Sequence, residues 1–266
     1  FTATSAVCVT GLSVVDTATH WTGFGQGIIL LLIQLGGLGI VTVVSIGVVL
    51  VAERIGLSHT RVLAADLRTD SYSNLPKLVR NIVLTTLAFE ALFAVVLSAR
   101  FFFAHNYGFR TAALHGVFHS ISAWNNAGFA LYTDNFLGFA NDWFFSIAVC
   151  LAVILGGIGF PVLRSFAIHK FNWRMWPLHS KLMVSATAVL LVLGTALFLV
   201  FEWSNPETLG ALPESSRLHS AFFHSVQTRT AGFNSVDVAA LNEESLLVST
   251  FLMFIGGGSA STAGGN

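Results

Sequence analysis

Charged side chains are scarce in this 266-residue chain, in which Asp, Glu, Lys and Arg make up 10% of the residues, as 13 basic and 13 acidic ones. A soluble globular domain carries roughly 25%. The shortage excludes an ordinary cytosolic enzyme, and the even balance excludes a nucleic-acid binder, which needs a surplus of Lys and Arg. Disorder is excluded because 54% of the chain is apolar. With a mean hydropathy of +0.74, the sequence predicts an all-α polytopic membrane protein.

Cysteines are also few. Cys8 and Cys150 both lie in apolar surroundings, so they predict no disulfide framework and are interpreted as small packed hydrophobes. The chain also lacks a starting methionine and a basic leader, and it stops at Asn266 within a glycine-rich run. We therefore expect an interior fragment of a longer protein.

Five apolar stretches are about long enough to cross a bilayer, which takes ~20 residues. They lie between Asp16 and Glu53, between Asn81 and Arg100, between Asp142 and Arg164, between Lys181 and Glu202, and after Glu244. The last of them runs into the glycine-rich stretch 256–265, which should break it as a helix.

The loops between these stretches differ in charge. Nine of the 13 basic residues fall in the two loops that follow the first and third stretches. These nine are Arg54, Arg61, Arg68, Lys77, Arg80, Arg164, Lys170, Arg174 and Lys181. The positive-inside rule places this side in the cytoplasm. The opposite side carries most of the acids, and an acidic outer vestibule would concentrate cations.

The outer loops contain an internal repeat. The string FHSI at 118–121 precedes NAGF at 126–129, and FHSV at 223–226 precedes TAGF at 230–233, a period of about one hundred residues. A third copy, VTGL at 9–12, opens the chain. Each of these glycines leads, 24 to 28 positions later, to a second glycine motif. The sequence therefore predicts three copies of one structural unit.

The segments before these turns, 111–124 and 216–228, carry His and Ser and are too short to span a bilayer. We interpret them, together with 2–9, as re-entrant half-helices. A half-helix that enters from outside points its partially negative C-terminal end toward the membrane midplane, where a cation is favoured.

The glycine in each turn suits a selectivity filter. Backbone carbonyls replace water around a monovalent cation only where successive residues turn their oxygens to the pore, which glycine permits. The alternative is that these glycines serve only close helix packing, but three turns in register favour the filter. The predicted ion-binding residues are Val9, Thr10, Gly11, Asn126, Ala127, Gly128, Thr230, Ala231 and Gly232.

Together these motifs resemble the Ktr/Trk/HKT superfamily of potassium transporters, and most of all its Ktr-type (KtrB/TrkH-like) membrane subunit. The matching strings are TSAVCVTGL at 4–12, QLGGLG at 34–39, NNAGF at 125–129, TRTAGF at 228–233 and GGGSASTAGG at 256–265. The resemblance implies four helix–pore loop–helix repeats around a pseudo-fourfold pore. This chain would hold about two and a half of them: residues 1–52 as the first without its outer helix, 53–163 as the second, and 164–266 as the third up to its gate loop.

The resemblance also implies a function and partners. The function is uptake of K⁺ across the plasma or inner membrane through a gated pore, with Na⁺ as a candidate coupling ion in symport. No enzymatic activity is expected, no cofactor in this chain, and no metal besides K⁺ at the filter. The implied partners are a second copy of the chain and a cytoplasmic nucleotide-binding regulatory ring of the RCK type (KtrA or TrkA). The basic loop 164–181 is a candidate docking surface for that ring, or for anionic lipid.

In this family a glycine-rich loop under the filter acts as an intramembrane gate. By position the gate residues are Gly256, Gly257, Gly258, Ser259, Ala260, Ser261, Thr262, Ala263, Gly264 and Gly265. Small residues and hydroxyls independently allow a flexible loop with polar atoms in a pore. The alternative is a helix end followed by a solvent loop. Asn266 departs from the family pattern of an aliphatic residue followed by Lys.

Two kinds of buried polar residue have competing interpretations. Glu90 falls in the middle of the second apolar stretch, where a charge costs about 3 kcal/mol, so it is functional, or else it is protonated or hydrogen-bonded between helices. His115 and His119 have the spacing of a helical metal pair, but His224 repeats His119 in the third unit. We therefore favour structural histidines.

The charged residues near the turns also have two readings. Arg229 precedes the third turn, where it either tunes ion access or ties the half-helix to Asp237 or Glu243. Asp16, Asp134 and Asp237 each follow a turn, and either attract cations or cap the next segment.

Two other functions fit less well. An intramembrane serine hydrolase would use Ser259, but three filter-like turns have no role in it. A secondary transporter of small anions would need helix N-termini at its site, whereas these half-helices present C-termini. The choice between K⁺ and Na⁺ depends on carbonyl geometry, which the sequence leaves open.

Overall fold

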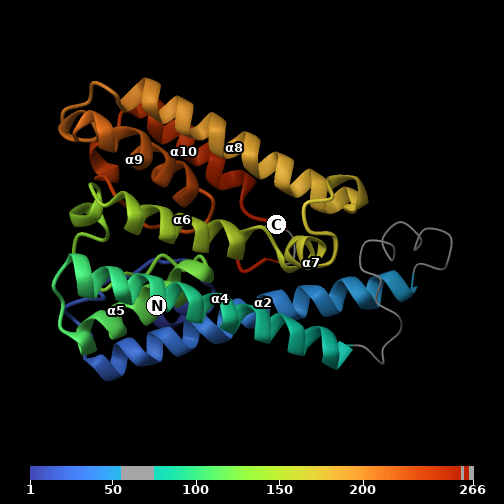
Figure 1. Ribbon diagram of the computed structural model, residues 1–266. Coiled ribbons are helices and arrows are strands. Elements are labelled where there is room, and N and C mark those ends of the chain that lie inside the picture. Colours follow the sequence, from blue (N-terminus) through green and yellow to red (C-terminus); the bar gives the residue numbers. More distant parts are fainter. Residues whose placement is uncertain (55–74, 259–260, 264–266) are drawn as a thin grey trace.

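The computed structural model describes residues 1–54, 75–258 and 261–263, and within these ranges every regular element is a helix (Figure 1). The α-helices are α1 (Thr2–Val7), α2 (Gly23–Arg54), α4 (Leu75–Ala104), α5 (Phe109–Trp124), α6 (Trp143–Gly157), α7 (Phe160–His169), α8 (Leu178–Glu202), α9 (Glu214–Gln227) and α10 (Glu243–Ile255). Short 3₁₀ turns are η2 (Leu137–Phe139), η3 (Trp173–Met175), η4 (Leu209–Ala211) and η5 (Val238–Ala240).

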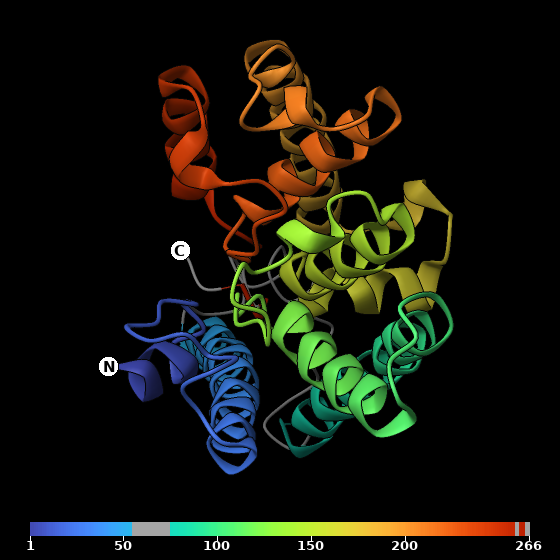
Figure 2. The ribbon, with the colours of Figure 1, turned by 90° about the vertical axis from the view of Figure 1, so that its left-hand side faces the viewer.

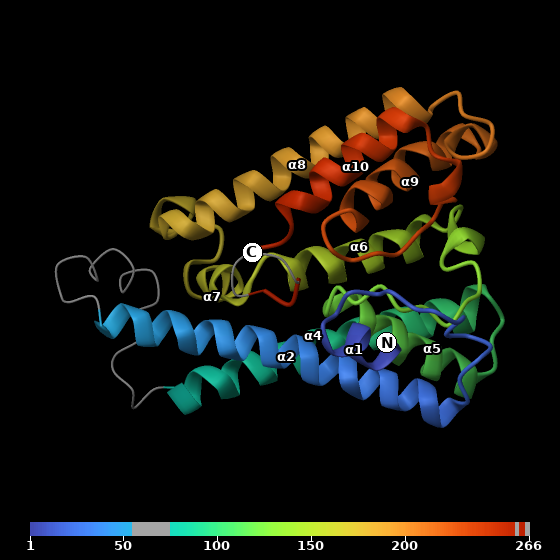
Figure 3. The ribbon, with the colours of Figure 1, turned by 180° about the vertical axis from the view of Figure 1, so that it is seen from behind.

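The helices form three units around a common centre (Figure 2). In the first, α1 packs on α2; in the second, α5 lies along α4 and contacts α6; in the third, α9 lies along α8, which also contacts α10. Helix α6 contacts α9 as well as α5, so it joins the second unit to the third, and Figure 3 shows it between them. The architecture is that of the repeated unit predicted from the sequence.

The three short segments expected as half-helices are α1, α5 and α9, of 6, 16 and 14 residues. At ~1.5 Å per residue, even 16 residues reach only about 24 Å, less than the ~30 Å hydrocarbon core. Each one runs beside a longer helix and ends near the centre of the molecule. They therefore enter the membrane without crossing it.

Among the described residues, two helices are long and apolar enough to cross a membrane, Lys77–Ala104 and Leu178–Glu202. They match the second and fourth expected spans. Helix α2 is 32 residues long and covers the first. The last helix ends at Ile255, where Gly256 has a φ of 66°, so the predicted break at the glycine-rich stretch is confirmed.

The third expected span is wrong as a single straight helix. The segment between Asp142 and Arg164 forms α6 and α7, which meet at an angle of 98°. Gly159 has a φ of 97°, a backbone conformation that glycine adopts easily, and Pro161 lies in the first turn of α7. Proline lacks an N–H and favours a helix start, so the chain turns sharply here and starts a new helix.

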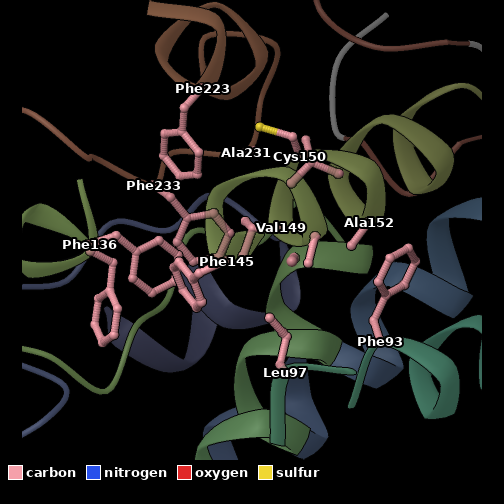
Figure 4. Close-up of a cluster of buried hydrophobic side chains, with 14 of the residues drawn as sticks. Phe93, Leu97, Phe136, Phe145, Val149, Cys150, Ala152, Phe223, Ala231 and Phe233 are labelled. Carbon is pink, nitrogen blue, oxygen red and sulfur yellow. The ribbon is translucent and has the colours of Figure 1, made fainter. Parts of the chain in front are cut away.

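An aromatic core holds the second and third units together (Figure 4). Phe136 stacks on Phe233 with ring centroids 4.7 Å apart, and its edge contacts Phe145 at 4.8 Å. Phe223 and Ala231 are buried in the same cluster. Since lipid is as apolar as these rings, close packing rather than hydrophobic transfer stabilises the cluster. Phe233 follows Gly232 directly, so this core fixes the position of the third turn.

Asp142 connects α4 to α6 at the outer end of the molecule. Its carboxylate accepts two hydrogen bonds of 2.9 Å from the Arg100 guanidinium, one of 2.9 Å from His105 Nε2, and one of 3.1 Å from the Phe145 backbone N–H at the start of α6. Burial, the largest influence, raises the pKa of Asp142, but hydrogen bonds from Arg100, His105 and Phe145 together lower it below its ordinary value. The ionised carboxylate is thus the form that the fold stabilises.

We expect Asp142→Asn to lower the free energy of unfolding by about 2 kcal/mol, because the amide keeps only one acceptor oxygen and its four hydrogen-bond donors lose the negative charge. Since the folded pKa is depressed, this stabilisation is complete at neutral pH. It declines as the pH falls below about 4, the ordinary pKa of aspartate. Thermal unfolding in detergent at pH 7 and at low pH measures both effects. Asp134→Asn, at an exposed position, is the control, and equal melting of the two variants would contradict the prediction.

Candidate functional site

The three predicted turns lie between the three units, where loops from each unit converge (Figure 2). They share one backbone conformation, in which the first and third residues have a positive φ and the residue between them does not. The positive φ values are 55° and 71° at Val9 and Gly11, 54° and 72° at Asn126 and Gly128, and 73° and 75° at Thr230 and Gly232. A left-handed non-glycine residue costs roughly 1–2 kcal/mol. Its presence at the same position in all three turns shows that the surroundings impose this conformation.

The turn glycines face one another. A Cβ on Gly11 would lie 2.6 Å from the carbonyl oxygen of Ala127, and a Cβ on Gly128 would lie 2.7 Å from that of Ala231. The latter Cβ would also lie 3.4 Å from the Cα atoms of both Gly11 and Gly232. The second and third turns therefore each direct a carbonyl oxygen at the glycine of the preceding turn, where a side chain would have no room.

The half-helices end at these turns. The backbone N–H of Thr10 donates to the carbonyl of Ser5 at 3.0 Å, and that of Ala127 donates to the carbonyl of Ser122 at 2.8 Å, at the matching position of the second unit. The C-terminal ends of α1 and α5 thus point at the turns. Their partial negative charge favours a cation there and disfavours an anion.

The second set of predicted glycines has a packing role. A Cβ on Gly36 of α2 would collide with the carbonyl oxygen of Val7, and a Cβ on Gly156 of α6 would collide with that of Trp124. Val7 and Trp124 both stand four residues before a turn glycine. Helices α2 and α6 therefore contact the backbone just before the first and second turns at van der Waals distance, which only glycine allows.

A cavity of about 140 Å³ lies next to the first and second turns. Gly11 and Gly128 line it, together with polar groups of Asp16, Thr133 and Asn135. These residues belong to the loops on the outer side of the turns. The cavity is lined mostly by polar groups and is large enough to hold water molecules beside the glycines.

Asp16 caps its own loop, which is one of the two roles that the sequence left open. Its carboxylate accepts hydrogen bonds from the Ala18 N–H at 2.9 Å and from the Thr19 and Thr133 hydroxyls at 2.8 Å, so it caps its own loop and ties it to the second unit. The Ala18 hydrogen bond, with those from Thr19 and Thr133, lowers the pKa of Asp16. The carboxylate therefore stays charged at the cavity wall. Asp237 caps η5 through the Ala239 N–H at 2.9 Å.

The described part of the predicted gate lies against the second unit. The Gly258 N–H donates to the carbonyl of Gly157 at 2.8 Å, and the Thr262 N–H donates to that of Gly156 at 3.3 Å. The Thr262 hydroxyl donates to the carbonyl of Trp124 at 2.7 Å, at the end of half-helix α5. The described part of the loop after α10 is thus packed against the second unit and is not exposed to solvent.

The described gate residues 256–258 and 261–263 are all buried. Ser259, Ala260, Gly264 and Gly265 lie outside the described residues. The serine that a hydrolase would need is among these four.

The proposed ties of Arg229 to Asp237 or Glu243 are wrong. Its Nε and one terminal nitrogen donate instead to the carbonyl of Gly256, at 3.3 and 3.2 Å. Helix α10 runs from Glu243 toward the third turn, so its last residues, and not its first, lie beside that turn. Arg229 thereby connects the third turn to the start of the glycine-rich loop.

His119 has a structural role. Its Nδ1 bonds the carbonyl of His115 at 2.7 Å, and its Nε2 accepts the Leu131 N–H at 3.1 Å, which secures the loop after the second turn. In the described part of the chain no three His, Cys, Asp or Glu residues form a group that could hold a metal ion. His224 contacts the hydroxyl of Ser249 at 3.4 Å.

Glu90 contacts the second turn, which sequence reasoning did not foresee. Asn125 Nδ2 donates to Glu90 Oε1 at 2.9 Å, across 35 positions of sequence. The hydrogen bond between helices that the sequence analysis offered for Glu90 is therefore present.

Comparison with known proteins gives concordant matches. The family model TrkH, described as a cation transport protein, matches residues 1–265. The chain is 41% identical to Ktr system potassium uptake protein B of Vibrio alginolyticus and 39% identical to the protein of the same name from Bacillus subtilis. It is 38% identical to the potassium/sodium uptake protein NtpJ of Enterococcus hirae. All of this chain is matched, and it spans 58%, 59% and 58% of the lengths of these relatives.

Among solved structures, the potassium transporter TrkH from Vibrio parahaemolyticus has a TM-score of 0.72 to this chain. The match covers 97% of this chain and 49% of that one, at 17% sequence identity. The two proteins share a fold over nearly all of the chain.

Proposed function

Because the chain belongs to the TrkH family of cation transport proteins, we propose that it supplies three sides of a filter through which potassium ions cross the membrane. One observation carries this proposal: three turns with the same alternation of left-handed residues bring their glycines together, with carbonyl oxygens between them. The names of two relatives that match the whole chain, potassium uptake protein B, support K⁺ as the ion.

The site suits a cation at each step of the path. An ion from outside meets the polar cavity with the charged Asp16, then the carbonyl oxygens of Ala127 and Ala231 among the turn glycines. Rings of carbonyl oxygens replace the hydration shell of a monovalent cation. The C-terminal ends of the half-helices add negative potential at the same level.

A fourth side of the ring is part of this proposal. The chain spans about 58% of the relative's length, and we propose that the fourth side corresponds to a part of that length which the chain does not match, which gives a pseudo-fourfold pore. Residues 1–52, 53–163 and 164–266 are then its first, second and third repeats. The nine filter residues named from the sequence stay a proposal, supported by the shared backbone of the three turns.

The loop from Gly256 onward acts in this proposal as the gate. Its support is position: it starts at the end of α10, lies beneath the turns, and is hydrogen-bonded to Trp124 and Gly156 behind the second turn. In the closed state of the gate, these hydrogen bonds hold the loop in place. Opening requires the loop to leave them.

Assembly and coupling are also proposed. Two relatives are named protein B of the Ktr system, and this name implies that the system has other components. It supports a separate regulatory subunit, which we propose to be a cytoplasmic nucleotide-binding ring. We further propose a homodimer. The potassium/sodium uptake protein among the relatives supports Na⁺ as a coupled or competing ion.

Rubidium uptake tests the function. The complete protein is produced in potassium-depleted cells that lack their own uptake systems, and ⁸⁶Rb⁺ uptake is followed. We expect saturable uptake that excess K⁺ abolishes and excess choline does not. A correctly inserted protein that takes up no Rb⁺, or whose uptake K⁺ leaves unchanged, would exclude a potassium pathway.

A further inference from the structure

Glu90 is a buried acid in a membrane-spanning helix and has no cationic partner in the described structure. It lies in the middle of α4, with 4% of its surface exposed. Arg100, ten residues further along α4, pairs instead with Asp142 at the start of α6, as does His105. Charged groups at this depth are costly and rare, so their presence indicates a function.

Asn125 is the contact through which Glu90 could act. It caps the C-terminal end of α5, three residues before the second turn glycine Gly128, and is fully buried. Its Nδ2 donates to Glu90 Oε1 at 2.9 Å and to the carbonyl of Ile121 at 2.9 Å. The Oδ1 of Asn125 packs closely against Gly37 of α2, where a Cβ would collide with it.

A second hydrogen bond strengthens this attachment. The Ser120 hydroxyl donates to the backbone carbonyl of Glu90 at 2.6 Å. Half-helix α5 is therefore fastened to α4 at one residue, by its backbone and by its side chain. The side-chain bond is the one that reaches the residue next to the turn.

The third unit has the backbone bond without the carboxylate. There the Ser225 hydroxyl donates to the carbonyl of Leu191 at 3.1 Å, so Leu191 takes the place of Glu90. Arg229 stands three residues before the turn glycine Gly232, as Asn125 stands three before Gly128. It donates to the carbonyl of Gly256, at the end of α10, and not to the preceding outer helix. Of these two units, only the second therefore has a side chain of its outer helix, Glu90, hydrogen-bonded next to the turn.

We propose that Glu90 is a positioning residue for ion selectivity, which holds the second filter turn in place by accepting the Asn125 hydrogen bond. The inference rests on the proposed function, because it assigns a role within the filter. What matters is the acceptor oxygen and not the negative charge. Without it, Asn126 and Ala127 would shift, and carbonyl oxygens discriminate between cations only in a defined geometry.

The test compares two substitutions of Glu90 in the complete protein, with ⁸⁶Rb⁺ and ²²Na⁺ uptake measured in the same cells. Glu90→Gln keeps an acceptor oxygen at the same position, and we expect its ratio of Rb⁺ to Na⁺ uptake to stay within about twofold of the parent. Glu90→Leu copies the third unit and removes the acceptor. We expect it to lower the ratio about tenfold and to raise the KM for Rb⁺ more than it changes the maximal rate.

The control is Glu202→Leu, which removes another buried carboxylate. Glu202 accepts hydrogen bonds from Asn205, Thr208 and the Asn242 N–H in the third unit, away from the turns. This variant should lower protein yield without changing the Rb⁺ to Na⁺ ratio. A ratio in Glu90→Leu that equals the parent's, or a ratio in Glu90→Gln as low as in Glu90→Leu, would overturn the inference.

Should Glu90→Leu not fold, a reciprocal exchange gives the answer. Asn125→Asp places two acceptors opposite each other and should lower the ratio. Adding Glu90→Gln supplies a donor again, so the double variant should recover part of it, and a failure to recover would overturn the inference. A parent that takes up no Rb⁺ would instead refute the proposed function, and the inference with it.

Discussion

Replacement of Gly128 with alanine is expected to reduce Rb⁺ uptake by ~100-fold, since ~2.7 kcal/mol of barrier corresponds to that factor. Two effects combine at this position. The residue has a φ of 72°, which costs alanine roughly 1–2 kcal/mol, and the new Cβ would lie 2.7 Å from the carbonyl oxygen of Ala231. Either the backbone of the second turn changes conformation, or the Ala231 carbonyl oxygen moves away from the new methyl group. Uptake in cells with matched surface expression measures the loss.

Two other glycine variants calibrate this result. Gly138→Ala places a methyl group in open space without a positive φ, so it should leave uptake unchanged. Gly232→Ala meets the strain of a φ of 75°, but its nearest neighbour is Gly128 Cα at 3.7 Å. It should therefore lose less activity than Gly128→Ala. Full uptake by Gly128→Ala would mean that the turns only pack helices together.

Replacement of Arg229 with alanine is expected to have the opposite sign and to raise the maximal rate of Rb⁺ uptake about tenfold. The guanidinium donates twice to the carbonyl of Gly256, and a hydrogen bond to a charged group contributes roughly 1.5–3 kcal/mol. Loss of this bond destabilises the closed position of the gate loop relative to the open one. Uptake at saturating Rb⁺ measures the shift.

Two variants separate this effect from loss of charge and loss of fold. Thr262→Val removes the hydroxyl that donates to Trp124 and changes no charge, so it should also raise the rate, by a smaller factor. Arg217→Ala removes an arginine that donates to the carbonyls of Leu212 and Gly210 at the outer end, away from the gate, and should leave the rate unchanged. A fall in rate in both Arg229→Ala and Thr262→Val would contradict the role assigned to the loop.

The repeated elements were predictable because local features encode them. The length and the polar residues of the half-helices predict them, and a glycine that follows each at nearly the same distance predicts the turns. The bend at Gly159 also had a local signal, a glycine two residues before Pro161. It was missed because the apolar stretch was read as one span.

The contacts behind the turns were not predictable in the same way. Glu90 and Asn125 are 35 positions apart, and their contact depends on how α5 packs along α4. Arg229 was assigned acids that are near in sequence, whereas its partner is brought back by the full length of α10. The left-handed backbone of Val9 had no local signal at all, since a β-branched residue disfavours it.

The shortness of α5 and α9 has a consequence for how the protein is made. Neither half-helix is long enough to be retained in a bilayer as an independent segment, and α9 also carries Arg217, His219 and His224. The helices that precede them, α4 and α8, are long enough and are synthesised first. Each half-helix must therefore fold back from the outer surface along an anchor that is already inserted. We therefore expect biogenesis to proceed one repeat at a time, in the order of translation.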